Sequence, residues 1–496
     1  MNRRRRYWLI GWFPISLFVL IGAILLVWEI IDRELQYGKS ADSLAAAIRE
    51  TDAIDPNWRW EALDATRPEV PDDENIVKQI ELIYRSANQL GNRRGLASNL
   101  TLEEVAPNQL HSPEFIALLE EQQKRCEPGL TIARNLHQFE KGRYRVSLPK
   151  NPLTMGLGQF LQEGREVLTL LRNECIRLGI ENRPAEAVHL IHGMVNTAQA
   201  SRDALYLMDH LLRNAGRATV VDEIQRLLGR TEPGAALQEL IEPLEKMSDK
   251  NHLIWGIRGE RAWSHRVFEL WEQDEGELVR WIDQSRDFGL IRKPVSIRNY
   301  RPFLKQDHAT KLRFFNRMIE TFELPLYEQV EAVNRLRLLT QDENSLDALM
   351  ASPGVNSLDA LIASPGGEQI LEAERRGTAL IDSARVAIAA ELFRHENQRW
   401  PKDLQEIPQK WLKEIPVDPY DGKPMRYRIE EEGIVIYSVG ADQIDQQGQL
   451  DLRPARGNPG DLGIRLWNPN KRRLPPPPPQ PELLEFPDEL VEPEKE

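Results

Sequence analysis

The feature that most constrains this chain is an uncharged, mostly apolar run near its N-terminus. The run extends from Tyr7 to Trp28 and directly follows four consecutive arginines, Arg3 to Arg6. A helix needs roughly 20 such residues to cross a bilayer, because its backbone groups must pair within the segment and each residue adds about 1.5 Å. The run therefore predicts a single transmembrane helix, to which we assign residues 7–31. A cleaved signal peptide, with a shorter apolar core and a small-residue cleavage site, fits less well.

The arginines set the expected orientation of this helix. Positively charged flanks stay cytoplasmic, so residues 1–6 form a cytoplasmic tip and the rest of the chain lies on the far side. We accordingly expect a single-pass protein of the bacterial inner membrane, held by a signal-anchor helix, with its bulk in the periplasm.

Composition limits the remaining chemistry. The formal net charge of −13 argues against a nucleic-acid partner, because such binders concentrate Lys and Arg to neutralise phosphates. The two cysteines, Cys126 and Cys175, do not belong to C-x-x-C pairs, so no zinc site is expected. Two buried thiols are favoured over a disulfide between them.

The segment from 74 to 340 carries a helical pattern. Apolar residues recur in it at spacings of three and four, and convincing strand alternation is absent. The pattern predicts an all-α body of antiparallel helices with short loops.

Turn signals and repeats divide the rest of the chain. Residues 344–367 contain a tandem duplication that is too short for a solenoid; we interpret it as a spacer, with a partner-binding site as the alternative. Five prolines at 475–479 predict a polyproline II segment before an acidic, disordered end. The expected division is a tip 1–6, a transmembrane helix 7–31, a connector 32–73, an all-α body 74–340, a spacer 341–367, an α+β domain 368–470 and a Pro-rich acidic disordered tail 471–496.

Several short motifs follow one another in the α+β domain. They are Ala-Ala-Glu-Leu-Phe-Arg at 389–394, Asn-Gln-Arg-Trp-Pro at 397–401, Ile-Pro-Val-Asp-Pro at 415–419, Gly-Lys-Pro-Met-Arg-Tyr at 422–427 and Tyr-Ser-Val-Gly-Ala-Asp at 437–442. In this order and spacing, residues 371–468 resemble the globular head of type II secretion pseudopilins, the major pseudopilin most closely. Residues 425–429 and 434–437 are strand-like runs around Glu-Glu-Gly, which predicts a β-hairpin.

The resemblance also implies a calcium site. In that family the loop after the Gly-Ala-Asp motif binds calcium, which takes about six to eight oxygen ligands. The carboxylates available here are Asp442, Asp445, Asp451 and Asp461. The loop is rich in glutamine where the family has glycine and acids, so a solvated acidic loop is the alternative.

No segment carries a catalytic signature. His189 and His192 lie three apart on an expected helix, with His210 nearby, but no Glu-x-x-His pattern accompanies them. Structural histidines are therefore favoured over a metal site. Four tryptophans form a near-regular series: Trp255, Trp263, Trp271 and Trp281. An aromatic helix core is favoured over a ligand groove as the explanation of this series.

Three functional hypotheses are consistent with these patterns. The first is a non-enzymatic, membrane-anchored scaffold or assembly adaptor that binds other envelope proteins, because the head resembles a secretion component and the body shows no site. The second is an envelope hydrolase with a site assembled by the helical body, which a deep pocket with converging acids and histidines would favour. The third is a ligand-binding sensor that uses the tryptophan series. A flat tryptophan region without a pocket would exclude this third hypothesis.

Overall fold

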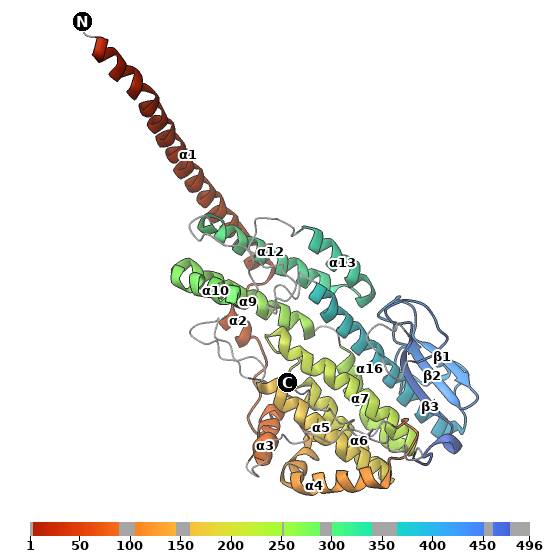
Figure 1. Cartoon of the computed structure of the whole chain (residues 1–496). Coiled ribbons are helices and arrows are strands. Elements are labelled where there is room, and N and C mark those ends of the chain that lie inside the picture. Colours follow the sequence, from red (N-terminus) through yellow and green to blue (C-terminus); the bar gives the residue numbers. More distant parts are fainter. Residues whose placement is uncertain are drawn as a thin grey trace, which may run out of the picture.

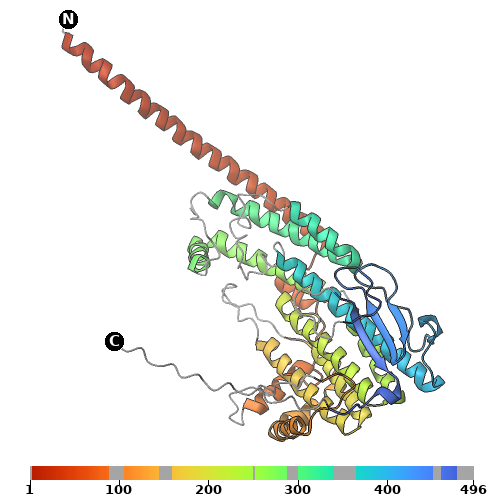
Figure 2. The same cartoon turned by 45° about the vertical axis from the view of Figure 1, so that its right-hand side comes forward.

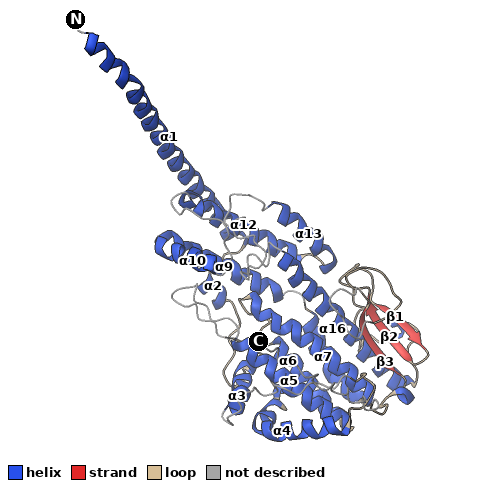
Figure 3. Cartoon of the chain, in the orientation of Figure 1, coloured by secondary structure: helices blue, strands red, loops and turns tan. Residues whose placement is uncertain are grey.

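The computed structural model describes residues 3–88, 105–144, 159–249, 252–287, 300–339, 365–450 and 460–476, and the side chains of α1 from residue 25 onward. The described chain is mainly helical, with one small sheet at its side (Figures 1 and 3). The α-helices are α1 (Arg3–Ile54), α2 (Trp60–Ala65), α3 (Ile76–Asn88), α4 (Pro113–Ala133), α5 (Gln159–Ile180), α6 (Pro184–Gln199), α7 (His210–Arg230), α8 (Ile241–Ser248), α9 (His252–Gln273), α10 (Glu275–Asp287), α12 (Leu304–Glu323), α13 (Leu326–Leu339) and α16 (Pro365–Asn397). Short 3-10 helices are η1 (Leu136–Gln138), η3 (Leu207–Asp209), η4 (Gly234–Leu240), η5 (Arg301–Phe303), η6 (Leu404–Glu406) and η7 (Pro469–Lys471).

The first helix corrects the prediction for the N-terminus. α1 is one continuous helix of 52 residues that projects from the body (Figures 1 and 2). Within the described residues, no helix combines the length and apolar character needed to cross a membrane. The predicted transmembrane helix at 7–31, and with it the single-pass inner-membrane location, is therefore wrong. The prediction treated the apolar run as a separate element, whereas it continues into a helix that is charged from Glu29 onward.

The C-terminal end of α1 packs onto the body along one stripe. Ser40, Leu44, Ala47 and Thr51 are its buried residues, at spacings of three and four, and they face α12. Residues 32–73, expected as a connector, are thus largely helical. The tryptophans of this segment, Trp58 and Trp60, are buried against the body.

The centre of the helical body is formed by α5, α6 and α7, which pack on one another in all three pairs. The amphipathic stripe of α3 and the buried side of α4 close the same core. α6 and α7 approach so closely that a Cβ atom at Gly216 would lie 2.4 Å from Ala198 Cβ. Only glycine permits this crossing, because real Cβ contacts are much longer.

The sheet is antiparallel in the order β1-β2-β3 and consists of β1 (Arg426–Glu430), β2 (Gly433–Ser438) and β3 (Leu462–Trp467). The predicted hairpin is present, with Tyr427 opposite Ile436. The third strand pairs Ile464 with Ile436, and every residue of the central strand is buried. α16 lies against this sheet (Figure 2).

One hydrophobic core joins this α+β unit to the helical body. A single cluster of buried side chains includes Ile80 of α3, Leu171 of α5, Ile388 of α16 and Ile464 of β3. α16 also packs on α7 and α8, so it serves as the central element of both parts.

Candidate functional site

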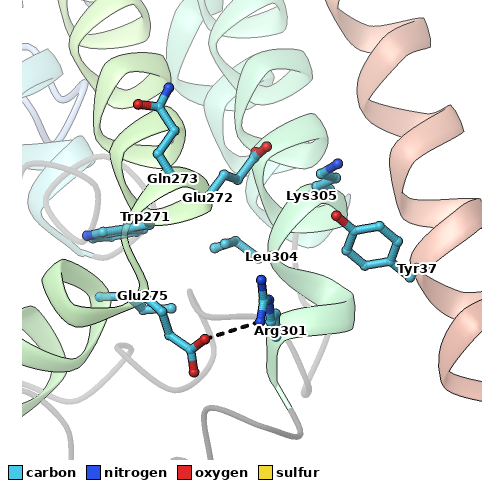
Figure 4. Close-up of a pocket in the computed structure, with 9 residues that line it drawn as sticks. Tyr37, Trp271, Glu272, Gln273, Glu275, Arg301, Leu304 and Lys305 are labelled. Atoms are coloured by element: carbon cyan, nitrogen blue, oxygen red, sulfur yellow. Dashed lines mark hydrogen bonds and ion pairs between the residues drawn. The ribbon is translucent and has the colours of Figure 1, made fainter. Parts of the chain in front are cut away.

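A cavity of about 180 Å³ lies where α1, α9, α10, η5 and α12 meet (Figure 4). Its lining residues are Tyr37, Trp271, Glu272, Gln273, Glu275, Leu278, Arg301, Leu304 and Lys305. Figure 4 shows Tyr37 and Lys305 together on the α1 side, with the ammonium 4.8 Å from the ring centre. Opposite them, Arg301 donates to Glu275 across 3.2 Å.

Local sequence explains how these side chains converge. α9 ends at Gln273, and the Asp274 carboxylate then accepts a hydrogen bond of 2.8 Å from the backbone N–H of Gly276. This interaction opens α10 in the manner of a helix N-cap. The resulting turn brings Glu272 and Glu275 from two helices to one rim of the cavity.

A buried chain of hydrogen bonds runs from Glu272, in the cavity wall, through His308 to His265. The Glu272 carboxylate accepts from His308 Nδ1 at 3.0 Å, so His308 Nε2 accepts from His265 Nδ1 at 2.8 Å. His265 Nε2 lies 3.4 Å from Glu269. Burial, and then the neighbouring His308, lower the pKa of His265 to about 3, so its ring is neutral at pH 7.

The chemistry open to this arrangement is limited by its size and pairing. The line of carboxylate and imidazoles contains the groups of a proton relay. However, the lining residues of the cavity include no Ser, Thr or Cys nucleophile. The cavity is smaller than the roughly 300–1,000 Å³ typical of ligand pockets, which does not favour the hydrolase hypothesis and leaves room for water or a small polar molecule.

The tryptophan series divides between two places. Trp255 and Trp263 pack with Trp60, Leu63 and Tyr206 in a hydrophobic cluster. Further along, Trp271 and Trp281 pair with ring centres 4.8 Å apart, and Trp271 also lines the cavity. Most tryptophans of the series thus pack in an aromatic core, as favoured, whereas Trp271 also contributes to the wall of the cavity.

The predicted calcium ligands are engaged within their own loop. Asp442 accepts from the N–H of Ile444 and from Gln446, and Asp445 accepts from Tyr437 and from the N–H of Gln447. Asp461 is buried, which raises its pKa, and one of its oxygens accepts from the N–H of Gly448 at 2.7 Å. Asp451 lies outside the described residues.

An arginine supplies the positive charge beside these acids. Arg426 donates to the fully buried Asp418 at 2.7 Å and to Asp421 at 2.5 Å, and its Nε lies 3.6 Å from Asp445. Among the described residues, no group of three or more His, Cys, Asp or Glu side chains could hold a metal ion. The described carboxylates therefore do not fit a calcium ion in this arrangement, and the calcium site stays a prediction.

The cysteines and histidines are placed in the helical body. Cys126 and Cys175 are buried and not bridged, and burial raises the pKa of both thiols. His189 and His192 share the carboxylate of Glu239, whereas His210 lies beside His252, with ring centres 5.4 Å apart. Glu239 belongs to another element, so no local sequence pattern pointed to it.

Neither a family model, a curated protein nor a solved structure matches this chain. A function for it is therefore inferred from the geometry of the described residues.

Proposed function

We propose that this protein is a non-enzymatic scaffold, an assembly adaptor that holds protein partners at a fixed spacing. The observation that carries the proposal is the rigid fusion of the α+β unit to the helical body through α16. Domains that move relative to one another usually meet across smaller, more polar surfaces. A shared hydrophobic core keeps the two parts of the protein at a fixed distance, as a scaffold for protein partners requires.

Buried charges reinforce this fusion at the start of α16. Glu374 is completely buried and accepts from Arg217 at 2.7 Å, and His252 Nε2 lies 3.2 Å away. Burial alone would raise the pKa of Glu374, but Arg217 and His252 hold it well below its usual range. Arg213 and Arg217 also donate to the carbonyl of Met247, so α7, α8, α9 and α16 are tied at one point.

A second set of contacts fastens the opposite end. Arg472 makes two hydrogen bonds to the buried Glu391 of α16, of 3.0 and 2.9 Å. Arg473 donates to the carbonyls of Gly179, Ile180 and Arg230 at the ends of α5 and α7. Cationic groups at helix C-termini satisfy carbonyls that lack partners in the helix.

The resemblance of residues 371–468 to pseudopilin heads supports the α+β unit as a partner-binding element. The test is site-specific photo-cross-linking in the source cells. The cross-linking residue replaces Val417 or Ile429, which are 50% and 52% exposed in the α+β unit, or Leu118, 56% exposed on α4, as the matched control. We expect a discrete protein adduct from the α+β positions and none from Leu118. Absence of any discrete adduct from Val417 and Ile429 would contradict the proposal.

Small-ligand sensing is a second candidate, favoured by one observation. Trp271 lines the cavity that is backed by Glu272 and the two histidines. Its test is a thermal-shift screen of small polar compounds with the wild type and Glu272→Gln. A compound that stabilises only the wild type supports sensing, and a screen without such a compound removes this candidate.

A further inference from the structure

The cavity beside α1 carries side chains of both charges in its wall. Glu272 and Glu275 line it from the end of α9 and the start of α10. Arg301 and Lys305 line it from η5 and the start of α12. Figure 4 shows the acidic side chains on the α9 and α10 side and the basic ones on the α12 side. A small molecule in the cavity therefore meets both signs of charge.

On the acidic side, Glu272 keeps one carboxylate oxygen for a donor in the cavity. Its Oε1 atom accepts from His308 Nδ1 at 3.0 Å, and this contact holds the carboxylate in place. Within the described parts of the chain, this is the one polar contact of Glu272. The side chain is 23% exposed, so a molecule in the cavity can reach it. Since a carboxylate accepts at about four positions on its two oxygens, Glu272 can also receive an ammonium group.

On the basic side, Lys305 has an aromatic ring in place of a carboxylate. Its ammonium lies 4.8 Å from the ring centre of Tyr37, and no Asp or Glu among the described residues forms an ion pair with it. Arg301 differs, because it already pairs with Glu275 at 3.2 Å. An ammonium has three donors, so Lys305 is the group that best receives a carboxylate from solution.

Between the two charged sides, the wall of the cavity is apolar. Trp271, Leu278 and Leu304 are buried side chains of this part. The volume of about 180 Å³ holds several heavy atoms, since a single water needs roughly 10–15 Å³ of such space. It is too small for the larger ligands that fill pockets of roughly 300–1,000 Å³. A compact molecule with a short apolar part fits these limits.

The balance of charge selects a molecule that carries both signs. The two acidic and two basic side chains of the wall have a formal sum of zero. A simple anion would pair with Lys305 but would approach Glu272 and Glu275. A simple cation would pair with Glu272 but would approach the two basic groups. Because like charges brought together are unfavourable, a neutral molecule with separated charges suits the cavity better than either ion.

We propose that this cavity binds a small α-amino acid as its zwitterion. The proposal names the ligand class for the small-ligand sensing candidate and rests on that candidate. At pH 7 an α-amino acid carries one carboxylate and one ammonium. The ammonium donates to Glu272, and the carboxylate accepts from Lys305. The short side chain lies against Trp271, while the pair between Arg301 and Glu275 stays closed.

Binding at this place acts on the attachment of α1. Tyr37 belongs to α1, whereas Lys305 and Glu272 belong to the body. A ligand held at Lys305 fixes the ammonium beside the Tyr37 ring, so it strengthens the contact between α1 and α12. Since a ligand that binds only the folded arrangement stabilises it, the bound amino acid holds α1 more firmly on the body.

The test is isothermal titration calorimetry of the full chain with glycine, L-alanine and L-serine. Propionate and ethylamine are the matched probes, because they lack the ammonium and the carboxylate of L-alanine respectively. We expect one amino acid per chain and at least about tenfold weaker binding of both analogues, as the loss of one charged hydrogen bond implies. Lys305→Gln and Glu272→Gln should each weaken binding of the amino acid by the same factor. Lys413→Gln, which changes a largely exposed lysine elsewhere, is the control and should bind as the wild type does.

Equal binding of L-alanine and propionate, or unchanged binding in Lys305→Gln, would overturn the proposal. Lys305→Gln keeps the test decisive if Glu272→Gln does not fold, because no described ion pair is lost with it. No binding of any of the three amino acids would also reject this ligand class. Sensing itself would survive that result if the wider screen found another compound that depends on Glu272, and would fail with it if the screen found none.

A second measurement tests the link to α1. L-Alanine should slow tryptic cleavage after Lys39, an exposed residue of α1 that follows Tyr37 closely. The protection should be seen in the wild type and in Lys413→Gln but not in Lys305→Gln. Equal cleavage rates with and without bound L-alanine in the wild type would contradict a ligand that lies between α1 and α12.

Discussion

The two longest helices of the described chain, α1 and α16, are attached to the helical body in opposite ways. From Leu371 to Arg394 of α16, no side chain is exposed. In α1, the described side chains are mostly exposed until Ser40, after which a single stripe is buried. α16 is thus a core element surrounded by protein, whereas α1 is an arm held along one side of its C-terminal end.

The charged contacts of the two helices differ in the same way. Glu374 and Glu391 of α16 are buried with their arginine partners. On α1, the Glu50 side chain is 51% exposed where it pairs with Arg313. Asp55, just beyond α1, is intermediate: it is 15% exposed and pairs with Arg258 and with the fully buried Arg261. We infer that α16 is essential to the stability of the fold. We expect that substitutions in α1 leave the helical body folded.

The largest loss of stability is expected from Glu374→Ala. This change leaves Arg217 buried without its carboxylate, and loss of one partner from a buried pair costs about 3–5 kcal/mol. The free energy of unfolding, measured by urea denaturation, should fall by this amount. Lys413→Ala, which removes a largely exposed pair with Glu245, is the control and should change little. Equal stability of both variants would refute the role assigned to α16.

A smaller effect is expected from Asp55→Ala at the foot of α1. Arg261 loses its carboxylate, but Asp55 is partly exposed, so we expect a loss of about 2 kcal/mol. The distinctive result is local: protease should cleave near residues 52–57 of the variant while α16 and the sheet stay intact. Simultaneous digestion of the α16 region would show that α1 belongs to the cooperative core.

The α16 junction should also respond to acid. Burial lowers the pKa of His252 to about 4, despite the nearby Glu374. Below pH 6.5 the unfolded chain binds a proton that the folded chain refuses, so stability falls as the pH drops from 6.5 toward 4. One such histidine contributes about 1.4 kcal/mol per pH unit. His252→Gln should reduce the slope of unfolding free energy against pH by one proton in this window, and an unchanged slope would exclude His252 as its source.

The sequence predicted local elements better than their interruptions. Apolar periodicity predicted the helical body, and the strand-like runs around Glu-Glu-Gly located the hairpin. Within the predicted all-α body, however, α6 and α7 are separated at residues 200–209, where no glycine or proline signals a break. Distant contacts cause this interruption: the N–H of Leu207 donates to Glu260, and Gly259 packs against the backbone of Leu205. Such contacts are invisible in a local window.

The sites were still less predictable, for the same reason. The cavity is lined by residues from three separate segments, and of these residues only Trp271 had been singled out in the sequence. The carboxylate of Glu239 and its partners His189 and His192 belong to separate elements of the chain. The histidine pair could be recognised in the sequence, but the carboxylate that contacts both histidines could not. By contrast, the apolar run of α1 was conspicuous, yet it led to a prediction that the described helix corrects.

The smallest loss of stability is expected from Glu50→Ala on α1, which removes the half-exposed ion pair with Arg313. Two long side chains lose conformational freedom to form this pair and water screens their attraction, so it should contribute only about 0.5 kcal/mol. Thermal unfolding at low and at high salt measures it, and the difference between wild type and variant should vanish at high salt because exposed charges are screened. A loss that is large and independent of salt would mean that α1 is attached as firmly as α16. The contrast between the arm and the core helix would then fail.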